Sequence, residues 1–240
     1  MVDIINWPIC LLRPQAASAN VVPFTRSGGA SLGGIERTVR TDLGYWAIDY
    51  NSVVVQSRHR DQWQTWQAIR QKLGGRVGLI AVPVQSAVSA PFSSGRFEPS
   101  GSVPHDDDTP FSDETLYSQS SIVVVSEGAT PIGATVIRLR IIDAAENLAG
   151  VRFSFNHALY ETGPVLEIEG DVWTVPIWPS VRELIPSGSD LEFDMPTCLC
   201  RLAQDRGMDI QPDNIRKSTY PSVSFQEATD YWNDLALGLI

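Results

Sequence analysis

The chain has 240 residues, of which 43% are hydrophobic and 19% are charged. This composition is typical of a folded globular protein, and the length allows one large β domain or two small ones. The formal net charge is −10 and the arginines are scattered, which disfavours a protein that grips nucleic acid, because such proteins usually carry a basic stripe.

Targeting signals are not evident. No apolar run approaches the ~20 residues needed to span a bilayer, and the start of the chain lacks the basic region of a signal peptide. Three cysteines, an odd number, define no disulfide framework. We therefore expect a protein that is made in a reducing cytoplasm and that could act elsewhere as part of an assembly.

Residues 1–37 mix short apolar runs with prolines and a glycine-rich stretch at 27–34. No Gly-Lys-Ser/Thr follows these glycines, so a flexible linker is favoured over a phosphate cradle. The segment does not resemble a self-contained domain. We interpret it as an N-terminal arm that adds a strand to a neighbour's sheet edge.

A strand, a helix and another strand are predicted next. Residues 38–55 alternate, with Trp46, Ile48 and Tyr50 on one face. A helix is predicted over 61–73, capped by Asp61 and ended by a glycine pair. A strand over 76–84 follows it. The residues that we assign to the buried stripe and the end of the helix are Trp63, Trp66, Ile69 and Gly74.

Residues 85–118 are rich in Ser, Pro, Gly and Asp, which indicates a long surface loop of a kind that is often functional. His105 with the three aspartates after it could hold a cation, but adjacent residues cannot all point inward, and the calcium-loop spacing is absent. A solvated acidic loop is favoured. Its candidate partner-contact residues are Phe92, Phe97, Asp106, Asp107, Asp108 and Phe111.

Strands are predicted again at 122–125, 135–142 and 151–156. The most strongly patterned stretch is 165–202, where two alternating strands flank Gly170-Asp171, typical of a hairpin with a type II′ turn. A second strand pair is predicted at 191–193 and 198–202. The core and turn residues assigned to this half of the chain are Phe153, Phe155, Gly170, Asp171, Trp173 and Pro179.

A C-terminal extension over 206–240 ends in a predicted helix. Ser224 begins that helix and Glu227 completes a capping box. Phe225 and Trp232 lie on its apolar face.

Catalytic and metal-binding signatures are weak. Cys198 and Cys200 lie on one side of a predicted strand without the second pair that zinc sites need, so we expect core cysteines. The common hydrolase motifs are absent. His157 near Glu161 is the nearest approach to an acid–base pair, and a local polar contact is the simpler explanation. We expect no enzyme, cofactor or metal site.

Three blocks carry a family resemblance: residues 63–84 (a helix with paired aromatics, then Leu-Gly-Gly-Arg and an apolar strand), 150–160 (Gly-Val-Arg-Phe-Ser-Phe) and 172–202 (Trp-Thr-Val-Pro-Ile-Trp-Pro, then Ile-Pro-Ser-Gly). In order and spacing the chain resembles the distal tail, or tail-tip, proteins of long-tailed bacteriophages and gene transfer agents. That resemblance implies a mainly β fold, a split β-barrel over residues 38–205 with a flanking helix.

The resemblance also implies a function. Six copies would form a ring at the distal end of the tail tube, around the DNA channel, in a virion assembled in the bacterial host cytoplasm. The partners would be other copies of the chain, the tail tube protein and the hub or baseplate proteins, and could include the tape-measure protein. The alternative is a carbohydrate-binding tail accessory protein whose loop aromatics contact the host surface.

Overall fold

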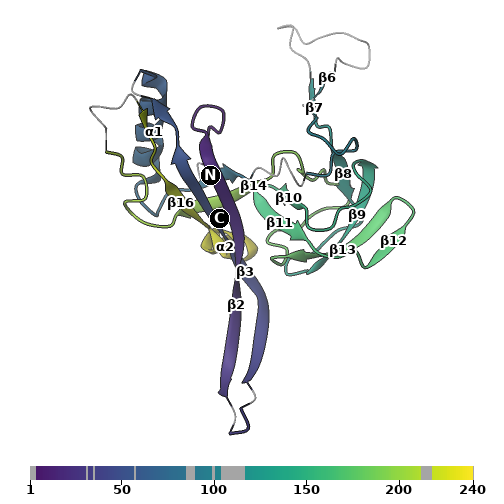
Figure 1. Ribbon diagram of the computed structural model, residues 1–240. Coiled ribbons are helices and arrows are strands. Elements are labelled where there is room, and N and C mark those ends of the chain that lie inside the picture. The colour runs from purple at the N-terminus through teal and green to yellow at the C-terminus, as the bar shows by residue number, and fades with distance from the viewer. Residues whose placement is uncertain are drawn as a thin grey trace.

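The fold is mainly β, as predicted, with 45% of the described residues in strands and 11% in two helices, and one sheet curls into a half-barrel. The computed structural model describes residues 4–30, 32–34, 36–56, 58–84, 90–98, 101–103, 117–211 and 218–239. Two six-stranded sheets and two helices make up the body, and a long hairpin projects from it (Figure 1).

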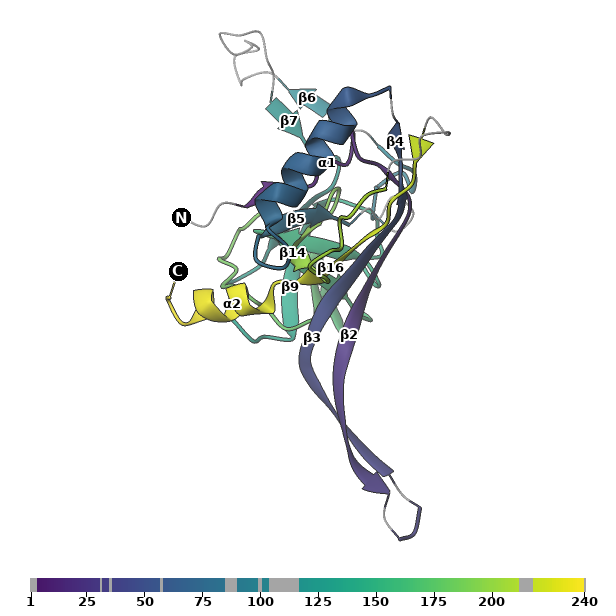
Figure 2. The same ribbon diagram turned by 90° about the vertical axis from the view of Figure 1, so that its left-hand side faces the viewer.

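The first sheet collects strands from both ends of the chain. Only its first pair is parallel; the others are antiparallel. Helix α1 (Arg60–Leu73) lies along this sheet and buries Trp66, Ile69 and Leu73 in its core (Figure 2). In spatial order the strands are β1 (Ile5–Asn6), β5 (Ile80–Pro83), β14 (Thr197–Leu202), β16 (Val223–Glu227), β3 (Glu36–Val53) and β2 (Pro14–Ala30).

The second sheet is formed by the middle of the chain, and its core is built around Phe153, Tyr160 and Phe193. Helix α2 (Thr229–Ala236) adds Trp232 to this core. The strands are β10 (Arg152–Phe155), β11 (Ala158–Thr162), β13 (Val172–Trp178), β9 (Val136–Asp143) and β8 (Val123–Ser126), with β12 (Glu167–Glu169) paired to β13. Two small pairs complete the structure: β4 (Val55–Gln56) with β15 (Ser218–Thr219), and β6 (Gly101–Val103) with β7 (Tyr117–Gln119).

Strand β14 separates the two cores. Cys198 and Cys200 face the first core, whereas Leu199 between them faces the second, as the alternation of a strand requires. Both cysteines are buried free thiols, so the prediction of core cysteines is confirmed. The Trp46 indole N–H, which donates to the Leu159 carbonyl at 2.8 Å, ties the sheets together.

The hairpin predicted at 165–178 is confirmed. Glu169 pairs with Val172 across Gly170, whose φ of 63° provides the left-handed conformation that the turn needs. Strand β13 ends at Trp178, also as predicted. Residues 191–193 are not a strand, because their only ladder contact among the described residues is a single bridge from Glu192 to Ser154.

Helix α1 has nearly the predicted bounds, but its start differs. The N-cap is His59, not Asp61, and no side chain caps the first turn. Gly74 ends the helix with φ 53°, as predicted. The strand after it is shorter than predicted, Ile80–Pro83, since the chain first turns back at Gly78 to donate to the Leu73 carbonyl at 2.8 Å.

The N-terminal segment is not a separate arm. Residues 14–30 form β2, which pairs with β3 of the same chain from Pro14–Val53 to Ala30–Glu36, so the boundary predicted after residue 37 falls inside β3. The predicted glycine-rich linker lies at the tip of this hairpin. Gly29 and Gly34 have φ of 81° and 74° there, which fits a reversal of the chain.

The predicted C-terminal helix begins five residues late. Residues 223–227 form β16, in which Val223, Phe225 and Glu227 are buried while Ser224 and Gln226 are partly exposed. That alternation of period two belongs to a strand. The capping-box pattern is therefore misleading here: Glu227 is a buried strand residue, and the helix spans Thr229–Ala236.

Candidate functional site

The most distinctive surface is the outer half of the β2–β3 hairpin, which we call the ribbon (residues 24–41). Figures 1 and 2 both show it leaving the body as two strands alone. Strand β16 pairs with β3 only between Ala47 and Tyr50. Within the described residues, neither edge of the ribbon therefore has a partner strand, and residues 23–30, 32–34 and 36–39 are all exposed.

The ribbon has two different faces. Phe24 and Arg26 lie opposite Thr41 and Val39 on one face, and Arg37 shares it because it is two residues from Val39. Phe24 is 52% exposed and Val39 is 64% exposed. This face, defined by Phe24, Arg26, Arg37 and Val39, is apolar and basic, and we call it the apolar–basic face.

The opposite face carries hydroxyl groups from Thr25, Ser27 and Thr38. The Ser27 hydroxyl donates to the Glu36 carboxylate on this side, so the acidic residue does not interrupt the apolar–basic face. An isolated two-stranded ribbon is at best marginally stable in water, and natural proteins usually cover long strand edges. The ribbon is thus a surface that binding to another chain would stabilise.

A buried ion pair lies where the ribbon joins the body. The Arg182 Nε donates to Glu227 Oε1 at 2.9 Å, and Glu227 Oε2 accepts from the Trp46 backbone N–H at 3.0 Å. Arg182 also donates to the Gly44 carbonyl, and its own backbone N–H donates to the Tyr160 hydroxyl at 2.9 Å. These bonds connect β3, β16, β11 and the segment after β13, so they fix the position of the root of the ribbon.

Burial raises the pKa of Glu227 above its ordinary value, and the attraction and hydrogen bonds of Arg182 offset this only in part. The neighbouring Tyr160 hydroxyl also has a raised pKa, mainly because it is buried. The sequence signal that could have revealed the buried ion pair was the alternation of residues 223–227, but the capping-box pattern obscured it.

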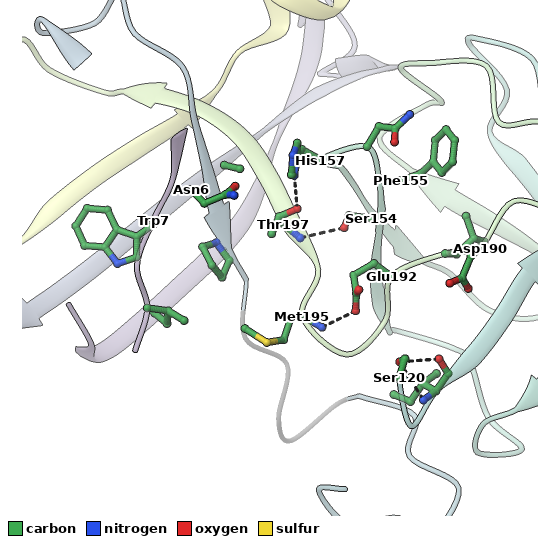
Figure 3. Close-up of a pocket in the computed structure, with 16 residues that line it drawn as sticks. Asn6, Trp7, Ser120, Ser154, Phe155, His157, Asp190, Glu192, Met195 and Thr197 are labelled. Carbon is green, nitrogen blue, oxygen red and sulfur yellow. Dashed lines mark hydrogen bonds between the residues drawn. The ribbon is translucent and has the colours of Figure 1, made fainter. Parts of the chain in front are cut away.

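A cleft of about 600 Å³ lies between the two sheets (Figure 3). Polar side chains line much of it, and several of them bond to the protein itself. His157 Nδ1 lies 2.8 Å from the Thr197 hydroxyl, the Thr197 N–H donates to the Ser154 hydroxyl at 3.0 Å, and Glu192 accepts from the Met195 N–H at 2.8 Å. Burial lowers the pKa of His157, which favours the neutral imidazole.

The expected contact between His157 and Glu161 is wrong. Glu161 lies four residues along β11 and pairs with Arg152 at 3.0 Å. His157 instead occupies the β10–β11 turn, where it and Asn156 have φ of 69° and 47°. The bonds of the cleft hold turns in place, and the described part of the chain contains no group of three or more His, Cys, Asp or Glu arranged to hold a metal ion.

The predicted core and turn residues are placed much as expected. Trp66, Ile69, Phe153 and Pro179 are buried, while Trp63, Phe155 and Trp173 are partly buried against the cores. Gly74, Gly170 and Asp171 lie at the ends of elements.

The predicted partner-contact loop is only partly described. Phe92 is buried, at 3% exposure, and therefore does not contact a partner. It packs edge-to-face with Phe97, at 5.6 Å between ring centroids, and Phe97 is 69% exposed. Asp106, Asp107, Asp108 and Phe111 lie outside the described residues.

Comparison of the sequence with models of known protein families and with curated proteins finds no match to either. In the described ranges, neither helix has the length and apolar character required to cross a membrane.

Proposed function

We propose that the chain is a non-enzymatic structural protein of a phage-type tail tip, which forms a ring by contact between identical copies. The ring would surround the DNA channel and join the tail tube protein to hub or baseplate proteins. The sequence blocks at 63–84, 150–160 and 172–202 suggest this class of protein.

The observation that carries the proposal is the ribbon. It exposes two strand edges and an apolar–basic face while it buries almost nothing in its own chain. Such an element fits a protein that completes its structure in an assembly. A projecting element that binds a different surface of the next copy makes a heterologous contact, and heterologous contacts close into rings when the rotation allows.

The charge balance is compatible with this role. A net charge of −10 disfavours binding to the phosphate backbone, which suits a channel that DNA passes through without being held. The buried Arg182–Glu227 pair supports an assembly role for the ribbon, because it fixes the position of the root of the ribbon on the body.

The test uses the full chain and a variant in which Asn-Gly replaces residues 25–40. Phe24 and Thr41 are directly opposite each other, so a two-residue turn fits the register. Residues 25–30, 32–34 and 36–39 among those removed are exposed, and we expect the free energy of unfolding to change by less than ~1 kcal/mol. Electron microscopy and light scattering should show rings for the full chain and monomers for the shortened one.

Particle fractions from the source organism provide the second measurement. Labelled antibodies against the chain should mark the tail tip of intact particles. Monomers of the full chain under all conditions, together with labelling of the capsid or of no particle at all, would overturn the proposal.

The carbohydrate-binding alternative has one supporting observation, the exposed ring of Phe97. A stacking platform usually needs more than one ring, and Phe92 is buried beneath Phe97. Glycan-array binding that disappears in Phe97→Ala would favour this alternative.

A further inference from the structure

A groove of about 340 Å³ lies where the ribbon meets helix α2, and we call it the root groove. Its rim is open, because Phe24 and Ile132 are 52% and 50% exposed. Arg182 is the one charged residue among the described residues that line it, and Glu227 already neutralises that charge. The apolar wall consists of Phe24, Ile132, Val181, Trp232 and Ala236.

The wall of the root groove contains a hydrogen-bond donor without an acceptor. Trp232 is only 4% exposed, and within the described residues its indole N–H has no partner. The indole N–H groups of Trp7, Trp46 and Trp66 each donate to a backbone carbonyl instead. A buried donor without an acceptor destabilises a fold. An oxygen atom of a bound molecule would supply the acceptor that Trp232 lacks.

The root groove is continuous with the apolar–basic face of the ribbon, because Phe24 belongs to both. From Phe24 towards the tip of the ribbon this face carries Val39, Arg26 and Arg37. Glu36 bonds to Ser27 on the opposite side of the ribbon and does not neutralise the two arginines. The combined surface is therefore apolar at the body and basic towards the tip.

An open strand edge runs along the same surface. Strand β16 pairs with β3 from Tyr50 to Ala47 and then turns into helix α2. At the next positions side chains replace the strand: Glu227 accepts from the Trp46 N–H, and Arg182 donates to the Gly44 carbonyl. Beyond Gly44 no described strand continues on that side, as the lone pair of strands in Figures 1 and 2 shows.

The open edge selects a polypeptide as the occupant. Only a peptide backbone supplies the alternating N–H and carbonyl groups that complete a strand ladder, whereas nucleic acids and lipids do not. The two arginines, in a chain with a net charge of −10, select acidic side chains on that polypeptide. The groove selects an apolar side chain at the end nearest the body.

We propose that the root groove and the adjoining edge of β3 bind an extended acidic segment of a partner protein. The segment adds as an antiparallel strand in line with β16. Its first apolar side chain enters the groove, one of its oxygen atoms accepts from the Trp232 indole N–H, and its acidic side chains face Arg37 and Arg26. The site is complete on one copy of the chain, so the inference goes beyond the proposed function and does not depend on ring formation.

A synthetic peptide tests the site with the full chain. The probe is fluorescein-labelled Thr-Leu-Thr-Val-Thr-Glu-Thr-Glu, which places leucine, valine and both glutamates on one face of a strand. The matched control peptide has lysine in place of both glutamates. Fluorescence anisotropy should show that the acidic peptide binds at least about tenfold more tightly than the lysine peptide.

Charge reversal tests the basic end of the surface. Arg26→Glu with Arg37→Glu should weaken binding of the acidic peptide at least about tenfold. Arg58→Glu with Arg60→Glu is the control, since it changes the net charge equally at the start of helix α1. All four arginines are exposed, so both variants are expected to fold.

A polar substitution tests the apolar end. Ile132→Ser should weaken binding about threefold to tenfold, because the leucine of the peptide loses part of the apolar wall. Ile142→Ser is the control, since Ile142 is 62% exposed on β9 and does not line the root groove. Its binding should equal that of the wild type.

Nuclear magnetic resonance tests the donor in the wall. The acidic peptide should move the indole N–H signal of Trp232 downfield, and Trp232→Phe identifies that signal. The indole signal of Trp66, which already donates to the Met208 carbonyl at 2.9 Å, should stay in place.

The outcomes separate this inference from the proposed function. Equal binding of the acidic and lysine peptides, or no binding of either, would overturn the site and leave a ring at the tail tip in place. A second copy of the chain or duplex DNA that occupies the surface while the acidic peptide does not bind would overturn the acidic segment as the occupant. Peptide binding by a chain that forms no ring would overturn the proposed function alone.

Discussion

Arg182 and Glu227 face each other at 2.9 Å with side chains only 10% and 1% exposed, although 45 residues separate them in the chain. Glu227 comes from β16 in the first sheet and Arg182 from the segment that follows β13 in the second. The pair thus joins the two sheets at the root of the ribbon.

Glu227→Leu should lower the free energy of unfolding by about 3–5 kcal/mol, because it leaves a buried guanidinium without its carboxylate. Arg182→Met added to Glu227→Leu should recover part of this loss, since both charges are then gone. Denaturant unfolding measures both changes. If the double variant loses as much free energy of unfolding as Glu227→Leu alone, or more, the ion pair stabilises the fold by more than the neutralisation of its two buried charges.

The matched control is the exposed pair of Arg138 and Glu169, whose side chains are 51% and 61% exposed. Glu169→Leu should change the free energy of unfolding by less than ~1 kcal/mol, as surface ion pairs usually do.

His157 should make stability depend on pH. Burial lowers its pKa below the ordinary value of 6.5, so the unfolded chain binds this proton more readily than the folded chain. The contribution to stability is then fully present above pH 6.5 and is lost as pH falls through the folded pKa. His157→Gln should reduce the slope of unfolding free energy against pH in this window.

A second titrating group affects the pH measurement. Glu227 acts in the opposite direction, because its raised folded pKa makes its contribution largest below the unfolded value and smaller as pH rises. The difference between wild type and His157→Gln removes this second effect, and an unchanged slope would contradict the prediction.

Gly78→Ala should destabilise the chain by about 1–3 kcal/mol, because a Cβ there would lie 2.6 Å from Leu73 Cα and 2.8 Å from the Leu73 carbonyl oxygen. Both atoms are backbone and cannot rotate away. Gly28→Ala is the control, since a Cβ added at Gly28 would have nothing within 4 Å of it. Thermal unfolding of both variants decides the matter: equal midpoints would show that the turn after α1 relaxes freely.

Trp66→Phe should cost about 1–3 kcal/mol, because the Trp66 indole N–H donates to the Met208 carbonyl at 2.9 Å in the core, and phenylalanine leaves that acceptor unpaired. Trp63→Phe, at a partly buried position on the same helix, should cost less. Chemical denaturation measures the free energy of unfolding of both variants. A larger loss for Trp63→Phe would mean that Trp63, not Trp66, is the main core residue of helix α1.

Short-range patterns predicted much of the body correctly. The alternation at 38–55 gave the core face of β3, the glycine pair after residue 73 gave the end of α1, and Gly170-Asp171 gave the turn between β12 and β13. Each of these features depends on residues close together in the chain, so local backbone preference and burial are sufficient to specify it.

The errors have a common origin in contacts between distant residues. Residues 14–30 looked like an arm because prolines and glycines interrupt them, yet pairing with β3 makes them a strand. Ser224 and Glu227 matched a capping box, but the carboxylate of Glu227 is buried in the core, where it accepts hydrogen bonds from Arg182 and the Trp46 N–H. Phe92 lies in a polar loop and is nevertheless buried.

By itself, the sequence determined the mainly β character and the turns, because these depend on composition and on spacings of two to four residues. Only the tertiary structure decided that the ribbon leaves the body without a further partner strand among the described residues. The physical reason is that strand pairing and the burial of Glu227 are settled between residues far apart in the sequence, where local preference carries little information.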